Sequence, residues 1–531
     1  MQARVRLAMS VAAIAVAALV ACEPTTPPTT TTTTTTTAPP ATTTTTKPPA
    51  PVLRYRDVQQ KASHNSYDRT EPLVDQLVYD RVRTLELDVW PDAAAGAWNV
   101  RHDSGGSSSC GALTTCLRQL AGFHKATVGH EPVTVWIESK SSSWGTGHGP
   151  AEFDAAITAA VGRSAIFTPA DLLAACPGAT TLYGAISGTC HWPAVADLHD
   201  KFLFVINGSD APYAASAPSG RLAFVAQEGS LSTPAAKSGN NVFVNLEYGA
   251  RTSATPSVVA ADHAAGFITR TWVTDDASSW NTTIGWGTNQ PATNEINPEV
   301  SPNLQTHDTG GGWPFKVLGS LPAKTAEAGQ VLGMKAVSGD LWDAADSAAF
   351  ASTTLSTTTA TTWTSLVSAR RSHVEQYGKG CLMARATTAA GSPYLALCRT
   401  SGDAPLRIQW RAASGAASNR TELSATQPGN YAYLKLAVEP FASSTNQTCA
   451  TGSGSLDGTT WVTVARVCVT GSLPLQGVSV SSHGTDAVRF DFAALTLVQG
   501  TTTTAVKSAT LGHFDNLGTV TSKSKSDNVL D

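Results

Sequence analysis

The chain has 531 residues, which is more than one hydrophobic core usually supports, so at least two folded units are expected. Its 36 basic and 40 acidic residues nearly balance. This balance argues against a polybasic nucleic-acid-binding protein, and we expect no nucleic acid among its partners. Charged residues make up only 14% of the chain, while Thr, Ser, Ala and Gly are plentiful, a composition that suits a β-rich extracellular protein.

The first 22 residues have the pattern of an export signal. Arg4 and Arg6 precede an apolar run from Leu7 to Val20, which is short for a membrane span and typical of a signal-peptide core. The run ends in Leu-Val-Ala-Cys, which resembles a bacterial lipobox with Cys22 as the lipidated residue. The alternative is an ordinary secretory signal with an incidental cysteine. We predict a secreted protein, lipid-anchored to the cell membrane through Cys22.

Residues 23–51 form a Thr/Pro-rich tract that includes an unbroken threonine run from Thr29 to Thr37. Such a segment has too little apolar surface to bury and is expected to be an extended or disordered linker. It would hold the folded part of the chain away from the membrane surface.

Eight cysteines remain when Cys22 is set aside, and they stand in close pairs along the chain. Eight cysteines allow many connectivities, so pairing between neighbours is a hypothesis. A zinc site is a weak alternative, because the sequence has no Cys-x-x-Cys pair and export favours disulfides. The predicted disulfides are Cys110–Cys116, Cys176–Cys190, Cys381–Cys398 and Cys449–Cys468.

Residues 52–319 alternate short apolar runs with Ala/Leu-rich segments typical of helices, such as 151–160 and 170–175. This alternation and length predict a (β/α) barrel of the TIM type, an α/β fold, although a doubly wound open sheet shows a similar pattern. The predicted strands are 82–90, 133–137, 202–206, 222–226, 242–246 and 267–272.

Residues 320–521 lose the helical pattern and predict an all-β sandwich. Asp457-Gly458 lies between two candidate strands and is a strong signal for a hairpin turn. Residues 522–531 are expected to be a flexible tail. The candidate strands of this part are 394–397, 407–411, 431–438, 460–469 and 477–481.

Polar residues follow or end successive strands of the predicted barrel. Glu86 and Asp88 are two residues apart on one strand, so both carboxylates share a face, and Glu138 ends the next strand. Catalytic groups of such barrels gather at the carboxyl ends of strands. With the amide of Asn65 these carboxylates form an all-oxygen set, which prefers a hard cation such as Ca²⁺ or Mg²⁺. His64 and His102 could handle protons or stabilise charge on a phosphate.

This pattern resembles the catalytic domain of phosphatidylinositol-specific phospholipases C, in particular the calcium-dependent type. In the calcium-independent bacterial enzymes an arginine replaces the metal, and no arginine follows Glu86 or Asp88 here. The motifs that carry the resemblance are Ser63-His64-Asn65-Ser66-Tyr67, Leu85-Glu86-Leu87-Asp88-Val89-Trp90, His102 and Glu138.

The resemblance implies a role for each matched residue. His64 would stabilise the pentavalent phosphate, and His102 would protonate the departing diacylglycerol oxygen. Glu86 or Glu138 would act as general base toward the inositol 2-hydroxyl. The product would be a cyclic inositol phosphate, released from a phospholipid at a membrane surface. The residues that would hold Ca²⁺ are Asn65, Glu86, Asp88 and Glu138.

Substrate recognition is less well marked in the sequence. Lys140 and Arg270 are the cationic candidates for binding substrate. The lysine-rich strand of eukaryotic relatives is replaced here by the apolar run 202–206. We therefore expect phosphatidylinositol without further phosphates as the lipid.

Two other functions compete with this one. Glycerophosphodiester phosphodiesterases share the barrel and the metal carboxylates, but they open with His-Arg-Gly where this chain has His64-Asn65-Ser66. The second half resembles concanavalin-like (laminin-G-like) sandwiches, which allows a surface glycan-binding protein with an inactive barrel. In that case Trp410 and Trp461 could stack on sugars, although tryptophan in a sandwich is more often a core residue.

Overall fold

The computed structural model describes most of the chain from residue 52 onward. The predicted signal peptide and linker, and the predicted domain boundary after residue 319, lie outside the described residues. The described ranges are 52–140, 144–208, 210–214, 220–229, 239–249, 254–296, 316–318, 331–369, 375–424 and 430–527.

Eight parallel strands close into a barrel, because the short first strand pairs with both the second and the last. The closed sheet confirms the predicted barrel and excludes the open doubly wound sheet. In order around the barrel the strands are β2 (Ala62–Ser63), β3 (Thr84–Pro91), β5 (Val133–Ser139), β6 (Phe202–Gly208), β7 (Phe224–Glu228), β8 (Asn241–Glu247), β9 (Ile268–Trp272) and β10 (Gln290–Thr293).

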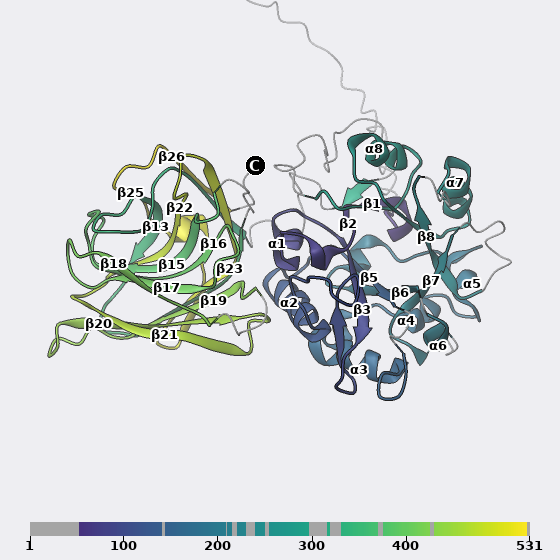
Figure 1. Cartoon of the computed structure of the whole chain (residues 1–531), viewed down its shortest axis with the longest axis horizontal. Coiled ribbons are helices and arrows are strands. Elements are labelled where there is room, and N and C mark those ends of the chain that lie inside the picture. The colour runs from purple at the N-terminus through teal and green to yellow at the C-terminus, as the bar shows by residue number, and fades with distance from the viewer. Residues whose placement is uncertain are drawn as a thin grey trace, which may run out of the picture. The chain divides into compact units, whose positions relative to one another are not determined.

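Helices alternate with these strands and lie outside the barrel (Figure 1). Strand β4 (Trp98–Val100) extends the sheet antiparallel to β3, and β1 (Val58–Gln60) pairs separately with β11 (Lys316–Leu318). No helix in the described part of the chain is long and apolar enough to cross a membrane. The helices are α1 (Leu73–Val78), α2 (Leu113–Ala126), α3 (Pro150–Val161), α4 (Pro169–Ala174), α5 (Leu182–Ile186), α6 (Ala211–Ala214), α7 (Pro256–Ala264) and α8 (Ala277–Gly285).

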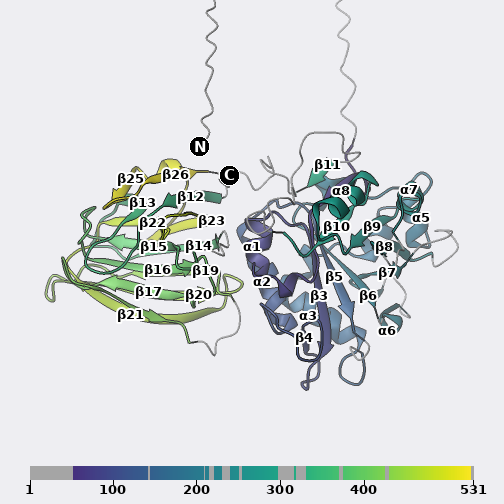
Figure 2. The ribbon, with the colours of Figure 1, turned by 45° about the horizontal axis from the view of Figure 1, so that its top comes forward.

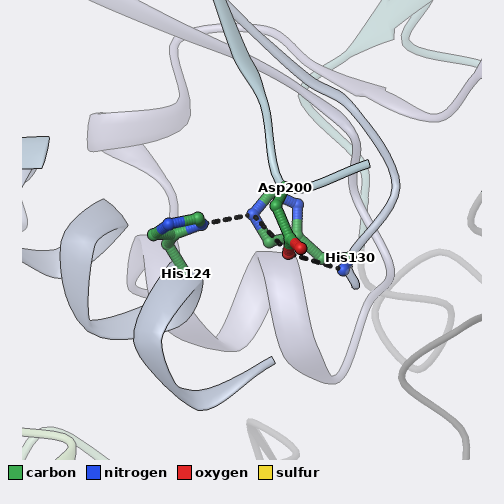
Figure 3. A group of neighbouring side chains, drawn as sticks. All are labelled: His124, His130 and Asp200. Atoms are coloured by element: carbon green, nitrogen blue, oxygen red, sulfur yellow. Dashed lines mark hydrogen bonds and ion pairs between the residues drawn. The ribbon is translucent and has the colours of Figure 1, made fainter. Parts of the chain in front are cut away.

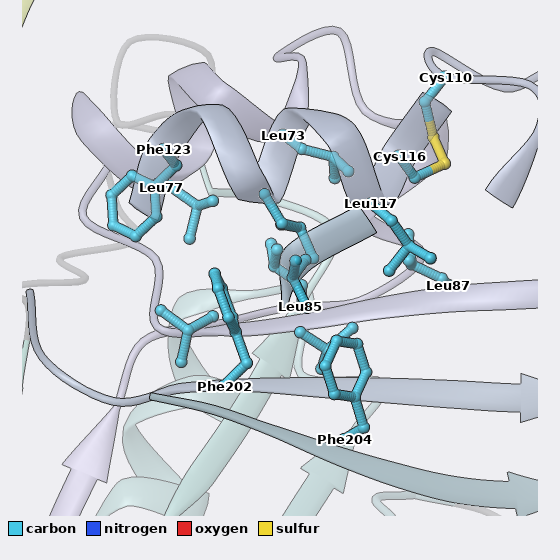
Figure 4. Close-up of a cluster of buried hydrophobic side chains, with 14 of the residues drawn as sticks. Leu73, Leu77, Leu85, Leu87, Cys110, Cys116, Leu117, Phe123, Phe202 and Phe204 are labelled. Carbon is cyan, nitrogen blue, oxygen red and sulfur yellow. A yellow bond between two sulfur atoms is a disulfide. The ribbon is translucent and has the colours of Figure 1, made fainter. Parts of the chain in front are cut away.

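The apolar side chains packed between the helices and the barrel explain which way the polar residues of β3 face. Leu85 and Leu87 are fully buried and pack beneath α1 and α2, beside Phe202 and Phe204 of β6 (Figure 4). Side chains alternate along a strand, so the intervening Glu86 and Asp88 face the barrel interior. Burial of the two leucines therefore sets the orientation of both carboxylates.

A buried polar network fills part of the barrel interior. The side chain of Gln290 on β10 accepts a hydrogen bond from Trp136 Nε1 at 2.8 Å. Its amide nitrogen donates to Gln60 Oε1 at 2.8 Å and to Thr134 Oγ1 at 3.0 Å. Each of these polar groups is satisfied inside the protein, as burial requires.

The C-terminal part is a β-sandwich of two antiparallel sheets, which confirms the predicted fold class. Figure 2 shows the strands of these sheets lying one above another. One sheet contains β12 (Val331–Val337), β14 (Thr361–Ala369), β19 (Tyr433–Val438), β20 (Gln447–Ser455), β21 (Trp461–Thr470), β23 (Ala487–Gln499), β24 (Thr502–Ala505) and β26 (Ser522–Ser526). The other contains β13 (Ala348–Thr354), β15 (Lys379–Arg385), β16 (Tyr394–Thr400), β17 (Arg407–Arg411), β18 (Ser418–Glu422), β22 (Leu475–Ser481) and β25 (His513–Leu517).

Two local expectations for the sandwich have different outcomes. Asp457-Gly458 forms the turn between β20 and β21, where Gly458 has a positive φ of 66° and Asp457 accepts hydrogen bonds from the backbone of Thr459 and Thr460. The flexible tail, however, was expected to begin at residue 522. Ser522–Ser526 instead form β26, which pairs with β12. The alternating Ser and Lys residues give no apolar signal for this edge strand. It is held by backbone pairing with β12 and by the Lys523 and Lys525 ammonium groups, which donate to backbone carbonyl oxygens.

All four predicted disulfides are present. Two lie in the barrel, Cys110–Cys116 and Cys176–Cys190. The other two join neighbouring strands of the sandwich, Cys381–Cys398 between β15 and β16 and Cys449–Cys468 between β20 and β21.

Candidate active site

Three carboxylates meet at the carboxyl ends of two neighbouring barrel strands. Glu86 and Asp88 come from β3 and Glu138 from β5, and the strand register places Asp88 directly beside Glu138. One oxygen from each of the three side chains lies within 4.8 Å of the others. The barrel therefore assembles the three carboxylates that the sequence placed on successive strands.

Lys140 is the cation nearest to two of these carboxylates. Its Nζ lies 2.8 Å from Asp88 Oδ2 and 2.5 Å from Glu138 Oε1. Asp88 is fully buried, and its burial, together with the charges of Glu86 and Glu138, raises the pKa of Asp88 to about 8 despite Lys140. A buried carboxylate with so high a pKa lacks enough positive charge around it.

Arg270, in the middle of β9, holds the third carboxylate. Its guanidinium lies 2.7 Å from Glu86 Oε2, donates to Asn245 Oδ1 at 2.8 Å, and is only 1% exposed. Burial by itself would raise the pKa of Glu86, but Arg270 and, to a smaller extent, His64 outweigh it and lower that pKa. Glu86 is therefore held in its charged form.

His64 and Asn65 follow β2 and face the same carboxylate. His64 Nε2 lies 3.8 Å from Glu86 Oε2, and the Asn65 backbone N–H donates to the same oxygen at 2.9 Å. Asn65 has a positive φ of 47°, and its Oδ1 accepts a hydrogen bond from the Tyr67 hydroxyl at 3.1 Å. Burial lowers the pKa of His64, so the imidazole is neutral at neutral pH.

His102 is the most exposed of the predicted site residues. It lies on the exposed loop after β4, where the Arg101 N–H donates to the Asp88 carbonyl oxygen at 3.0 Å. The backbone beside His102 is thus tied to the strand that carries Asp88. Asp103 caps a turn, because its side chain accepts from the Gly105 N–H at 3.0 Å.

The site also contains residues that sequence reasoning did not select. Asn245, two residues before the end of β8, is buried and donates to both carboxylate oxygens of Glu228 at 3.1 Å, and Glu228 ends β7. Trp272 ends β9, and its ring lies 5.6 Å from that of His64. These three residues are polar or aromatic and lie at or near the carboxyl end of an apolar strand. The same pattern had identified Glu86 and Glu138.

The donor set fits a hard divalent cation. Carboxylate oxygens of Glu86, Asp88 and Glu138 converge, and the Asn65 amide oxygen lies on the loop bonded to Glu86. Such oxygen-only sets prefer Ca²⁺ or Mg²⁺. The raised pKa of Asp88 is the observation that an added positive charge would relieve.

A parallel barrel with convergent carboxylates and a neighbouring histidine at its carboxyl end defines the class of metal-assisted barrel enzymes. A family model described as "Phosphoinositide phospholipase C, Ca2+-dependent" matches residues 100–272, which include His102, Glu138, Lys140 and Arg270. This match confirms the resemblance of the barrel to the calcium-dependent phosphoinositide phospholipases C, and with it the prediction of a phosphoric diester hydrolase of this type. A search of curated proteins finds no match.

Several solved structures are similar to the barrel. A calcium-dependent phosphoinositol-specific phospholipase C from Pseudomonas sp. is 24% identical, with 46% of this chain and 91% of that chain covered and a TM-score of 0.41. A calcium-dependent phosphatidylinositol-specific phospholipase C from Streptomyces antibioticus is 22% identical, with 45% of this chain and 94% of that chain covered and a TM-score of 0.39. A putative glycerophosphoryl diester phosphodiesterase from Silicibacter pomeroyi is 14% identical, with 48% and 96% covered and a TM-score of 0.30. TM-scores this low carry no conclusion about this chain.

Proposed function

We propose that the protein is a secreted, calcium-dependent phospholipase C that cleaves phosphatidylinositol at a membrane surface. The observation that carries the proposal is the convergence of Glu86, Asp88 and Glu138, with His64 Nε2 3.8 Å from Glu86. The products would be diacylglycerol and a cyclic inositol phosphate. The four disulfides support export into an oxidising compartment, and anchoring through Cys22 remains a prediction.

Calcium would be held by Glu86, Asp88, Glu138 and Asn65. Bound there, it would lower the pKa of the inositol 2-hydroxyl and neutralise part of the phosphate charge. The protein's own contribution is to hold three carboxylates together on rigid strands, so that little reorganisation is needed.

Glu138 is better suited than Glu86 to take the proton from the inositol 2-hydroxyl. Arg270 lies 2.7 Å from Glu86 and lowers its pKa, which makes Glu86 a weak base. The side chain of Glu138 is 33% exposed at the barrel mouth, where a substrate can reach it, whereas that of Glu86 is 2% exposed. Glu86 then serves as a metal ligand.

The histidines and the cations would act on the phosphate. A neutral His64 donates a hydrogen bond to a phosphate oxygen as negative charge develops. His102, on its exposed loop, would protonate the departing diacylglycerol oxygen. Lys140, 14% exposed, can turn toward the phosphate, whereas the buried Arg270 would act on substrate only through Glu86 and Asn245.

The decisive experiment measures water-soluble inositol phosphate released from phosphatidylinositol vesicles by the full chain, with Ca²⁺ or with a chelator. We expect release with Ca²⁺ only, and a loss of at least about a hundredfold in His64→Ala. His191→Ala, which changes an exposed histidine of the same domain, should keep full activity.

Absence of release under both conditions would contradict the proposal. Glycerophosphodiesters would then be tested in the same assay, because they suit the same metal carboxylates. A glycan ligand of the sandwich remains a prediction, and Trp410 and Trp461 are both half-buried against its core.

A further inference from the structure

A second cluster of metal-ligating side chains lies far from the carboxylates described above. His124 is on the last turns of α2, His130 lies in the loop before β5, and Asp200 lies in the loop before β6. These loops are at the amino ends of the strands, whereas the catalytic carboxylates are at the carboxyl ends. Figure 3 shows the three side chains turned toward one another.

The hydrogen bonds around His130 fix which ring nitrogen is available to a metal. His130 Nδ1 lies 2.7 Å from the Glu131 carbonyl oxygen, which can only accept, so Nδ1 carries the proton. The lone pair of Nε2 then points toward His124 and Asp200. Metal-binding histidines commonly donate their second N–H to a carbonyl in this way.

The distances suit a small ion with nitrogen and oxygen ligands. His124 Nδ1 lies 2.9 Å from His130 Nε2, and Asp200 Oδ1 lies 4.0 Å from the same nitrogen. Two ligand atoms on a tetrahedral zinc ion are about 3.3 Å apart, a value between these two separations. Changes of about 0.4 Å and 0.7 Å would bring these two separations to the tetrahedral value, and the three ligand atoms all lie within 4.8 Å of one another.

The carboxylate is held in place by the same loops. Asp200 Oδ1 accepts from the backbone N–H of Gly129 at 2.6 Å and from that of His130 at 3.2 Å. Asp200 has a positive φ of 62°, and its backbone N–H donates to the His130 carbonyl oxygen at 2.9 Å. The two loops are thus joined before any ion binds, which lowers the entropic cost of binding one.

Burial and charge agree with a site that is closed on one side and open on the other. His130 is fully buried and Asp200 is 36% exposed, so a water molecule can complete the coordination. Burial lowers the pKa of His124 although the charge of Asp200 opposes this shift, and the ring is kept neutral. To bind, neutral His124 moves its proton from Nδ1 to Nε2, so no proton is released.

We propose that His124, His130 and Asp200 form a zinc site, with water as the fourth ligand, that ties the end of α2 to the loops before β5 and β6. Two imidazoles and a carboxylate favour zinc over calcium or magnesium, which take oxygen ligands. The site is separate from the proposed calcium site, and its occupancy is independent of turnover.

Zinc binding by the full chain tests this proposal. The protein is stripped with chelator, placed in excess Ca²⁺ so that the catalytic carboxylates are occupied, and titrated with Zn²⁺. We expect one zinc per chain by elemental analysis and a higher melting temperature. We also expect strong visible absorption when Co²⁺ replaces zinc, as a tetrahedral site with histidine ligands gives.

Two variants and a control decide the outcome. His124→Asn should weaken zinc binding at least about tenfold and abolish the zinc-dependent rise in melting temperature. Asp200→Asn, which keeps an oxygen for the two backbone N–H groups, should do the same if the first variant folds poorly. His263→Asn, at a half-buried histidine on α7, should bind zinc normally. Equal zinc binding by wild type and both cluster variants, or none by wild type, would overturn the proposal.

Discussion

At the scale of single residues, Asp88 is the carboxylate on which the proposed calcium binding should depend most. It is fully buried, lies beside Glu138, and has only the ammonium of Lys140 as a nearby ion-pair partner among the described residues. Asp88→Asn removes one negative charge from the ligand set, and the affinity of calcium sites follows ligand charge. We expect calcium affinity to fall on the order of tenfold or more, together with activity, as measured by calcium titration and by inositol phosphate release.

The matched control for this variant is Asp92→Asn. Asp92 follows the same strand but is exposed, and its side chain caps its own turn. This variant should keep the calcium dependence of the wild type. Unchanged calcium affinity in Asp88→Asn would remove Asp88 from the ligand set.

Lys61 makes the stability of the barrel depend on pH. The residue is 3% exposed, and its ammonium donates to the Asp80 and Ile296 carbonyl oxygens at 2.8 and 3.1 Å. Burial lowers the pKa of Lys61 from 10.5 to about 8, against the opposing charges of Asp80 and Glu71. Between these values the unfolded chain binds a proton that the folded chain has released, so the free energy of unfolding rises with pH.

We expect this rise to be about 3 kcal/mol at most between pH 8 and pH 10, measured by urea unfolding at several pH values. Other groups titrate in the same range, so the slope of Lys61→Met is subtracted from that of the wild type. Lys507→Met, at an exposed lysine, should keep the wild-type slope. A slope in Lys61→Met as steep as in the wild type would show that Lys61 does not titrate in this range.

At the scale of elements, the barrel is closed by two short strands that carry little apolar signal. Strand β2 has two residues, and β10 reads Gln-Pro-Ala-Thr. A first strand was expected just before His64, but β10 was not predicted, because buried polar residues hold it in place of an apolar run. Gln290 provides three of the hydrogen bonds inside the barrel, to Trp136, Gln60 and Thr134.

Gln290→Met should therefore destabilise the protein although it adds an apolar residue to the interior. It leaves Trp136 Nε1 without its acceptor, and an unsatisfied buried polar group costs about 1–3 kcal/mol. The measurement is the free energy of unfolding in urea, with Gln447→Met on an exposed position of β20 as the control. A Gln290→Met variant as stable as the wild type would show that the network adds nothing to stability.

At the scale of the whole molecule, each of the two folds contains two disulfides. Cys381 and Cys398 are fully buried between β15 and β16, whereas Cys449 and Cys468 are half-buried between β20 and β21. The closed loops are of similar length, with sequence separations of 17 and 19 residues. Loss of either bond should thus cost about 3 kcal/mol through the unfolded state.

Replacing both cysteines of the buried pair by alanine should cost more than the same change in the half-buried pair, because it also leaves a small cavity. The expected difference is about 1 kcal/mol, measured by denaturant unfolding of the two double variants. A larger loss in the half-buried pair would show that packing around the first pair relaxes fully.

Sequence by itself predicted the two fold classes, the cysteine pairs and the residues that meet as a carboxylate cluster. These features have local causes. Alternation along β3 sends Glu86 and Asp88 inward once Leu85 and Leu87 are buried, and parallel strands bring their carboxyl ends together.

Only the tertiary structure decided that the sheet closes, that Arg270 holds Glu86, and that His124, His130 and Asp200 meet at the other end of the barrel. Each of these depends on residues far apart in the chain. Ion pairs and ligand clusters of this kind leave no periodic pattern in the sequence, because their geometry exists only once the strands have closed around a common axis.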